Sequence, residues 1–331
     1  MRPAEVIDRL LPRRLQAKAS SEQFAPSNIA LCKYWGKRDT AFNLPVNASL
    51  SVSLDYLGTH TRVTPIDAEV DEVWLNGQQL LPNARFSQKV SDFIDLLRRD
   101  QDLYFRVETR NNIPTAAGLA SSASGFAALT LALNDALSLQ LEPPMLSVLA
   151  RLGSGSASRS VFDGFVEWRM GQRDDGLDSH GIPLEAVWPG LCIGLAKVDA
   201  GEKAVDSRSG MQRTVETAHL YQSWPLQAAA DLEKLHQAIQ ARDFELLGQT
   251  AEQNALSMHA TMIASWPPLL YWQPESVAAM QTVWTLRRHG VPVYFTMDAG
   301  PNLKLLFEQE SREEVLRHFP DLETVEPFGS R

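Results

Sequence analysis

The segment NNIPTAAGLASSASG, residues 111–125, groups small and hydroxyl-bearing residues that could bind an anion. It is rich in glycine, alanine and serine and runs directly into an apolar stretch. A nest of backbone amides that opens onto a helix N-terminus has this composition and binds phosphate. The nucleotide loop G-x-x-x-x-G-K-[ST] requires a lysine here, and this segment has none. The sequence therefore predicts a phosphate site of another kind.

A second group lies in SNIALCKYWGKRD, residues 27–39. If residues 28–34 are extended, Lys33 shares a face with Ile29 and Leu31. An ammonium group on an apolar face is costly unless it meets an anion, so Lys33 is a candidate anion ligand. A lysine stem that reaches solvent is the alternative. The same segment also holds Asn28, Tyr34, Lys37, Arg38 and Asp39, and Trp35, which we interpret as a packing residue.

Two further segments carry an arginine and a carboxylate. In GSGSASRS, residues 153–160, Arg159 could grip a carboxylate or a diphosphate with its guanidinium fork, or it could belong to a solvated serine-rich turn. In YFTMDAGPNLKLL, residues 294–306, Asp298 ends an apolar run and precedes a glycine turn. Such an acid can act as a base or a metal ligand, or it can simply cap the turn.

The rest of the composition excludes several classes of function. The formal charge of −9 argues against nucleic acid as a partner. The only two cysteines, Cys32 and Cys192, form no metal-binding motif, so a reduced cytoplasmic location is expected. His259 has no partner at zinc-ligand spacing and is interpreted as a packing residue. No apolar run reaches the length of a membrane helix, and residues 1–23 are predicted to form a surface extension rather than a targeting peptide.

Hydrophobic periodicity predicts the elements that position these segments. Alternation predicts a strand over 47–66, and Val90, Phe93, Ile94 and Leu97 mark one face of a helix. A strand at 103–111 precedes the small-residue loop, a helix follows over 121–138, and a strand is expected at 191–200. The second half reads as helices followed by a strand that ends at Asp298 and a last helix. These patterns predict an α+β protein with a domain boundary near residue 187.

Together, the four segments combine glycine and serine loops with two lysines, one arginine and one acid. This set fits phosphoryl transfer, because positioning and charge neutralisation supply most of the catalysis of that reaction. These residue types do not identify the substrate of the reaction.

The segment PTAAGLASSASG resembles the nucleotide loop of the GHMP kinase superfamily, which has no such lysine. The blocks NIALCKYWGKRD, NLPVNASLSVSLD, VWLNG, SGSASRS, SGMQRTVET, MHAT and YFTMDAGPN resemble the diphosphomevalonate decarboxylase family in order and spacing, over residues 24–308. The resemblance implies a two-domain GHMP kinase fold. Its N-terminal domain, residues 24–187, would be like domain 2 of ribosomal protein S5, and residues 188–331 would form a ferredoxin-like α/β sandwich.

The resemblance also implies a reaction and a set of site residues. ATP, with Mg²⁺ carried by its phosphates, would phosphorylate the 3-hydroxyl of mevalonate 5-diphosphate, and loss of phosphate and CO₂ would leave isopentenyl diphosphate. The implied catalytic residues are Asp298, Lys33, Arg159 and Asn28. The implied substrate-binding residues are Tyr34, Trp35, Gly36, Lys37, Arg85, Ser154, Gly155, Ser156, Ala157, Ser158 and Arg159, and the ATP-binding residues are Pro114, Ala117, Gly118, Leu119, Ala120, Ser121, Ser122 and Ser207.

Two departures and several alternatives accompany this resemblance. Asp206 stands where the family usually has the first of two serines, which adds a negative charge near the bound phosphates and leaves the role of Ser207 open. Residues 171–183 also differ from the family. The alternatives are a phosphomevalonate decarboxylase, a mevalonate-type 3-kinase that stops after phosphorylation, and a non-catalytic binding protein of the same fold. A homodimer is expected by the same resemblance.

Overall fold

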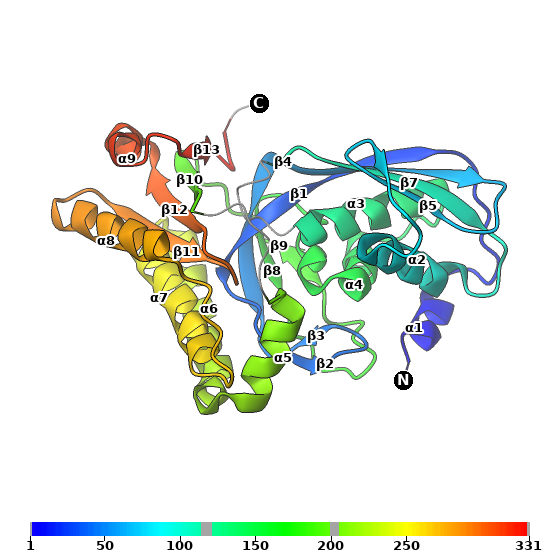
Figure 1. Ribbon diagram of the computed structural model, residues 1–331, viewed down its shortest axis with the longest axis horizontal. Coiled ribbons are helices and arrows are strands. Elements are labelled where there is room, and N and C mark those ends of the chain that lie inside the picture. Colours follow the sequence, from blue (N-terminus) through cyan, green and yellow to red (C-terminus); the bar gives the residue numbers. More distant parts are fainter. Residues whose placement is uncertain (1, 114–120, 199–204, 330–331) are drawn as a thin grey trace.

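The computed structural model describes residues 2–113, 121–198 and 205–329. In these ranges the chain forms two main sheets with helices packed on both, which confirms the predicted α+β class (Figure 1). Strands from the first half make a seven-stranded sheet in the order β6-β5-β7-β4-β8-β9, with β1 paired to β4. Strands from the second half make a four-stranded sheet in the order β11-β12-β10-β13.

The first half follows the predicted periodicity closely, and the strand expected at 47–66 and the helix expected at 121–138 are both confirmed. Its elements are α1 (Pro3–Leu10), β1 (Ser21–Cys32), β2 (Lys37–Asp39), β3 (Leu44–Pro45), β4 (Ser49–Ile66), β5 (Glu72–Leu75), β6 (Gln78–Gln79), α2 (Arg85–Arg98), β7 (Tyr104–Asn111), α3 (Ser121–Ala136), α4 (Pro143–Gly153), the short 3-10 helix η1 (Gly155–Ser158), β8 (Phe165–Trp168) and β9 (Gly181–Pro183).

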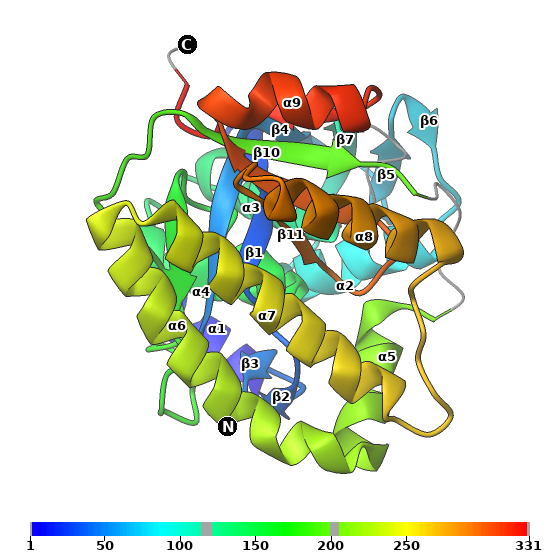
Figure 2. The same cartoon turned by 90° about the vertical axis from the view of Figure 1, so that its left-hand side faces the viewer.

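The second half is richer in helix, as expected. Its elements are β10 (Leu191–Ala196), α5 (Ser207–Thr217), the 3-10 helix η2 (His219–Ser223), α6 (Trp224–Ala241), α7 (Phe244–Ile263), α8 (Pro274–Arg288), β11 (Val293–Met297), β12 (Leu303–Glu308), η3 (Gln309–Ser311), α9 (Arg312–His318) and β13 (Glu323–Val325). Figure 2 shows α6 and α7 crossing in front of β1, with α5 below and α8 and α9 above. None of the described helices is long and apolar enough to cross a membrane.

Helices α2, α3 and α4 cover one face of the seven-stranded sheet (Figure 1). Val90, Phe93, Ile94 and Leu97 are buried together on α2, so the predicted helical face is confirmed. Because α3 is buried nearly all round, its sequence shows little amphipathic periodicity. The start of α3 is thereby fixed against the sheet, next to the small-residue loop.

Alternation along β11 and β12 assigns their side chains to two faces of the four-stranded sheet. Phe295 and Met297, with Leu303 and Leu305, pack into a core shared with α8 and α9. The opposite face turns toward β1 and β4 and shares a central core with α6 and α7. Residues of that face therefore lie between the two sheets. The central core includes Ile29, Leu31, Leu50, Val52, Ile193, Leu195, Leu235, Leu247, Tyr294 and Leu306.

The N-terminal segment differs from the expected surface extension. Helix α1 buries Val6 and Ile7 completely, and Leu11 and Leu15 continue into the core beneath α2 and α3. The strand β1 begins at Ser21, within the segment expected to be an extension. The periodic apolar residues of this segment thus contribute to packing, although charged residues surround them in the sequence.

Residues 169–180 connect the antiparallel strands β8 and β9. Asp178 accepts backbone hydrogen bonds from Gln172 and Arg173 inside this connection. The fully buried Arg151 of α4 donates to the carbonyl oxygens of Gly176 and Ser179. The stretch that departs from the family pattern is therefore fixed to the helix that leads into residues 153–160.

Candidate active site

Asp298 follows directly after β11, where the strand meets a tight turn closed by a hydrogen bond from the Gly300 N–H to the Asp298 carbonyl. The side chain of Asp298 remains 32% exposed, while every residue of β11 is buried. It follows Thr296 by two residues, which places it on the sheet face that turns toward β1. A carboxylate is thus held by a rigid strand end and still reaches solvent.

Lys33 lies opposite this carboxylate, just after the end of β1. Its Nζ donates to Asp298 Oδ1 at 2.9 Å and to the Ala30 carbonyl at 2.7 Å, and its side chain is only 2% exposed. Burial lowers the pKa of Lys33, while the charge and hydrogen bond of Asp298 act in the opposite direction. The expectation that Lys33 meets an anion rather than solvent is confirmed. The regular alternation of side chains along an extended strand does not continue to Lys33, because the β1–β4 register shifts between Ala30 and Cys32.

Lys304 is a second buried cation at the same carboxylate, and sequence reasoning missed it. Its Nζ lies 3.6 Å from Asp298 Oδ2, and its side chain is 2% exposed. It stands in β12, an inner strand of the four-stranded sheet. The sequence NLKLLFE shows a lysine among leucines, which could have indicated a buried lysine. The same pattern is also typical of an edge strand whose lysine points to solvent.

Arg159 comes from the other sheet and follows η1. Its side chain is buried, and its contacts are neutral: Nε and Nη2 lie 3.4 Å from Asn28 Oδ1, and Nη1 bonds Ser49 Oγ. Asn28 is itself fixed by donating to Ser160 Oγ at 2.7 Å. Burial lowers the pKa of Arg159 to about 10, and Asp298 opposes this shift. The guanidinium therefore stays charged at neutral pH close to Asp298.

The residues of η1 divide into two groups. Gly155, Ala157 and Ser158 are buried, and Ser158 Oγ donates back to the Gly155 carbonyl. Ser154 and Ser156 are partly exposed, with hydroxyl oxygens 3.5 Å apart. These two hydroxyls are the ones in this segment that can reach a ligand.

Tyr34 packs next to η1, where its ring meets Trp168 at a centroid distance of 4.7 Å. A Cβ on Gly155 would lie 3.0 Å from the Tyr34 hydroxyl oxygen, so glycine permits this approach. The buried Tyr34 hydroxyl has no hydrogen-bond partner among the described residues, and burial raises its pKa. A protonated phenol is thus available to donate to a ligand oxygen.

The rest of the segment 34–37 is more structural. The Trp35 ring is buried in the central core. Gly36 has a φ of +110°, and a Cβ there would collide with the hydroxyl of Tyr221. Lys37 Nζ donates to Asn43 Oδ1 at 2.6 Å, and burial followed by the charge of Arg208 lowers the pKa of Lys37 to about 8. Arg208 therefore lies close enough to Lys37 for the two charges to interact. After Lys304, Arg208 is a second site residue that the sequence analysis did not identify.

The departure at Asp206 has a structural explanation. Asp206 caps helix α5 by accepting from the N–H groups of Arg208 and Ser209. Its Oδ2 also accepts from Arg85 Nη2 at 2.9 Å, and this bond is the largest cause that lowers the pKa of Asp206 to about 2. Arg85 begins α2, so the ion pair links the first half to the second. Both partners are exposed, and Ser207 beside them is exposed as well.

The predicted ATP-binding residues Pro114, Ala117, Gly118, Leu119 and Ala120 lie outside the described residues. Ser121 and Ser122, which are described, begin α3 and are exposed. Their hydroxyls and the adjoining N-terminus of α3 are available to an anion.

Two buried residues of α7 support the site and were not predicted to do so. His259 Nε2 donates to the Asp298 carbonyl oxygen at 3.0 Å, and burial lowers the pKa of His259 to about 3, so it stays neutral. Asn254 Oδ1 accepts from the Lys33 backbone N–H at 2.8 Å. The carboxylate and the ammonium are therefore both held through their backbones by one helix.

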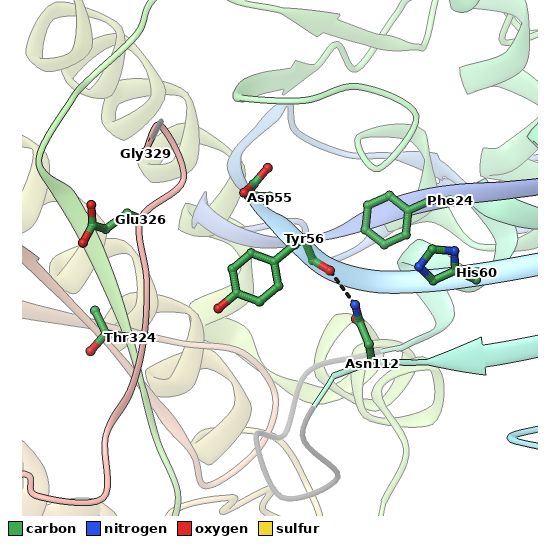
Figure 3. A pocket seen from close by; sticks show the side chains of 8 residues that line it. All are labelled: Phe24, Asp55, Tyr56, His60, Asn112, Thr324, Glu326 and Gly329. Atoms are coloured by element: carbon green, nitrogen blue, oxygen red, sulfur yellow. Dashed lines mark hydrogen bonds between the residues drawn. The ribbon is translucent and has the colours of Figure 1, made fainter. Parts of the chain in front are cut away.

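A separate groove of about 760 Å³ lies between β4 and the C-terminal segment. Figure 3 shows Tyr56 there, with its carbonyl accepting from Asn112 Nδ2, and the neighbouring rings of Phe24 and His60, which are tilted against each other. None of the predicted site residues that the structure describes lines this groove. It therefore contributes nothing to the arrangement around Asp298.

Comparison with known proteins agrees with this geometry. Residues 25–181 match the model of the diphosphomevalonate decarboxylase-like N-terminal domain, and residues 195–326 match that of the mevalonate 5-diphosphate decarboxylase C-terminal domain. The diphosphomevalonate decarboxylase of Aspergillus fumigatus is 39% identical over 312 residues, covering 88% of this chain and 77% of the relative. That of Schizosaccharomyces pombe is 38% identical, covering 88% and 79%.

Solved structures agree as well. Mevalonate diphosphate decarboxylase from Staphylococcus aureus has a TM-score of 0.88 and 41% identity, covering 93% of this chain and 95% of that one. A chain described as MDDEF in complex with MVAPP, AMPPCP and magnesium has a TM-score of 0.87 and 42% identity, covering 93% and 96%. The expected two-domain GHMP kinase fold is thereby confirmed. This chain belongs to the diphosphomevalonate decarboxylase family.

Proposed function

We propose that this chain catalyses the ATP-dependent decarboxylation of mevalonate 5-diphosphate to isopentenyl diphosphate, ADP, phosphate and CO₂. The observation that carries the proposal is the Asp298 carboxylate between the ammonium groups of Lys33 and Lys304, with Arg159 nearby. This arrangement can take a proton from a hydroxyl group and neutralise anions that approach it. The named relatives of the chain are decarboxylases of this substrate.

Each charged residue then has a distinct role in the reaction. Asp298 orients the 3-hydroxyl and accepts its proton as the γ-phosphoryl group is transferred. Lys33 stabilises the charge that develops on the phosphoryl group and on the departing carboxylate. Arg159, supported by Asn28, orients that carboxylate through its guanidinium fork. When phosphate leaves C3, the electron pair of the C–CO₂ bond forms the double bond of the product.

The substrate diphosphate is assigned to the basic side of the site. Arg208 is close enough for its charge to lower the pKa of Lys37, and Arg85 stands at the start of α2. The hydroxyls of Tyr34, Ser154 and Ser156 add donors on the same side. Gly36 and Gly155 allow the backbone to pack closely, whereas Trp35, Ala157 and Ser158 support this side from the core.

ATP and Mg²⁺ are assigned to the start of α3. MDDEF, a similar chain, forms a complex with AMPPCP and magnesium. Ser121 and Ser122 present exposed hydroxyls at the helix N-terminus, which suits phosphate oxygens. The residues of the loop at 114–120 and Ser207 of α5 complete the proposed nucleotide site. Mg²⁺ supplies charge neutralisation to the phosphates that carry it.

The assembly, location and domain bounds of the protein are further proposals. We propose a cytoplasmic homodimer with domains at residues 24–187 and 188–331, in which residues 1–23 pack onto the first domain. Analytical sedimentation would test the dimer, and limited proteolysis would test the domain boundary.

One assay tests the proposed function against its alternatives. Mevalonate, its 5-phosphate and its 5-diphosphate are each incubated with ATP and Mg²⁺, and CO₂ and ADP are measured together. The proposal expects equal amounts of CO₂ and ADP with the diphosphate as the preferred substrate. ADP without CO₂ would identify a 3-kinase, and preference for the 5-phosphate would identify a phosphomevalonate decarboxylase.

Arg159→Lys is expected to lower kcat/KM for the diphosphate substrate. The loss of transition-state stabilisation should be about 1.5 to 3 kcal/mol, the range of a charged hydrogen bond. Lysine keeps the charge but loses the planar fork that can hold both oxygens of a carboxylate. Steady-state kinetics with each substrate varied in turn measure the effect. A rise confined to the KM for ATP would place Arg159 at the nucleotide instead.

Asp206→Asn is expected to lower the KM for mevalonate 5-diphosphate by about fivefold at low salt, equivalent to about 1 kcal/mol for an exposed charge. Asparagine keeps the cap of α5 but removes the negative charge that pairs with Arg85. The difference should shrink as salt screens the site. The exposed Asp102→Asn is the control, and equal KM values for Asp206→Asn and wild type at low salt would contradict the assignment of Arg85 to the diphosphate.

A further inference from the structure

Lys304 occupies a position where a lysine is costly. It lies in β12 between neighbours β11 and β10, paired with Thr296 on one side and Leu195 on the other. Its side chain is 2% exposed, in a strand whose other residues are apolar from Leu303 to Phe307. A buried ammonium group without a counter-charge is strongly unfavourable. The location therefore requires an anion nearby.

The anion is the carboxylate of Asp298. Lys304 Nζ lies 3.6 Å from Asp298 Oδ2, and its other polar contact is the Asn302 carbonyl at 3.4 Å. Lys33 Nζ contacts the other carboxylate oxygen, Oδ1, at 2.9 Å. Each oxygen thus faces a different ammonium group, one from the end of β1 and one from β12.

The exposures separate the roles of the two sides of this carboxylate. Asp298 is 32% exposed, while both lysines are 2% exposed. Both ammonium groups are therefore covered, and only the carboxylate itself reaches the solvent side that a substrate would approach. Among the described residues, Arg159 also acts on Asp298 through its charge, and the neutral His259 donates to the Asp298 backbone carbonyl.

We propose that Lys304 is a positioning residue that fixes Oδ2 of Asp298 and keeps this carboxylate ionised, independently of Lys33. This inference rests on the proposed role of Asp298 as the group that accepts the 3-hydroxyl proton. The second cation has a specific consequence. When Lys33 interacts with an incoming phosphoryl group or carboxylate, Lys304 still holds Asp298 in place and in its basic form.

A titration without substrate tests the inference directly. The carboxyl absorption of Asp298 is isolated by infrared difference spectroscopy between each variant and the same variant carrying Asp298→Asn. In Lys304→Met, the pH at which Asp298 becomes protonated should rise by about one to three units, the range for loss of an adjacent cation. Lys304→Arg should restore most of the shift, and Lys234→Met, on an exposed part of α6, should leave it unchanged. An unchanged titration in Lys304→Met would overturn the proposal.

Thermal unfolding provides a second test that does not use activity. Asp298→Asn leaves two buried ammonium groups without their carboxylate and should lower the Tm. Removing Lys304 as well, in Asp298→Asn with Lys304→Met, should recover part of that loss, because one uncompensated charge is gone. A double variant no more stable than Asp298→Asn would contradict the ion pair.

Kinetics then separate this inference from the proposed function. In Lys304→Met, the acid limb of kcat/KM for the diphosphate substrate should move to higher pH by the shift seen in the titration, with the KM for ATP unchanged. A shifted titration in a protein that releases no CO₂ from any substrate would retain the role of Lys304 and reject the proposed function. A shifted titration with an unmoved acid limb would reject the link between them.

Discussion

Asp298→Asn is expected to lower turnover by about 10² to 10⁴-fold, the contribution of a positioned general base. Asparagine keeps the size and polarity of the side chain but cannot accept the proton of the 3-hydroxyl group. A tertiary alcohol is a crowded nucleophile, so the phosphorylation step itself should slow. The affinity for ATP should change little, because Asp298 is assigned to the 3-hydroxyl group and the nucleotide to the start of α3.

Rapid quenching with labelled ATP measures this step. No 3-phosphorylated intermediate should accumulate in Asp298→Asn. The variant also removes the counter-charge of Lys33 and Lys304, so its Tm must be measured alongside. Asp102→Asn, an exposed acid removed from the site, is the matched control. Near-native turnover in a folded Asp298→Asn enzyme would reject the assigned role.

Lys33→Met is expected to lower turnover by about 10² to 10³-fold, as loss of one preorganised electrostatic partner does. The ammonium group contacts Asp298 Oδ1, but Lys304 remains on Oδ2 and can still orient the carboxylate. Transfer of the phosphoryl group should therefore persist better than the later loss of phosphate and CO₂. A 3-phosphorylated intermediate should appear in the quench experiment, unlike in Asp298→Asn.

The pH dependence of Lys33 has a defined sign. Burial lowers its pKa, so the ammonium form is lost at a lower pH than in an ordinary lysine. Activity that depends on this charge should fall as pH rises through that lowered pKa. Lys33→Arg, which stays protonated, should remove this basic limb while keeping part of the activity. A basic limb that is unchanged in Lys33→Arg would assign the titration to another group.

Local patterns were sufficient where one element decides the outcome. The alternation of β4 and the apolar face of α2 depend only on residues close in sequence, and both were predicted correctly. The N-terminal segment failed this test, because the partners of Ile7 and Leu15 come from α2, α3 and the sheet. The charged residues around its apolar positions made the segment look like a surface extension, although α1 packs against residues distant in sequence.

The site shows the same division. Lys33 and Asp298 could be singled out from the sequence, because a lysine on an apolar run and an acid at a strand end are locally conspicuous. Their contact joins residues 265 positions apart, and only packing of the two sheets creates it. Asn254 and His259 gave no local signal, since an asparagine and a histidine on a helix are ordinary until the helix lies against Lys33 and Asp298.

The sequence by itself determined the chemistry available to this protein: a small-residue phosphate loop, an arginine in a serine turn, a lysine and an acid, all within blocks that identify the family. The tertiary structure decided which charges meet. It placed Lys304 next to Asp298 and Asp206 next to Arg85. The physical reason is that residue types and periodicity are local properties, whereas the energy of a charge depends on burial and on partners that only the folded chain supplies.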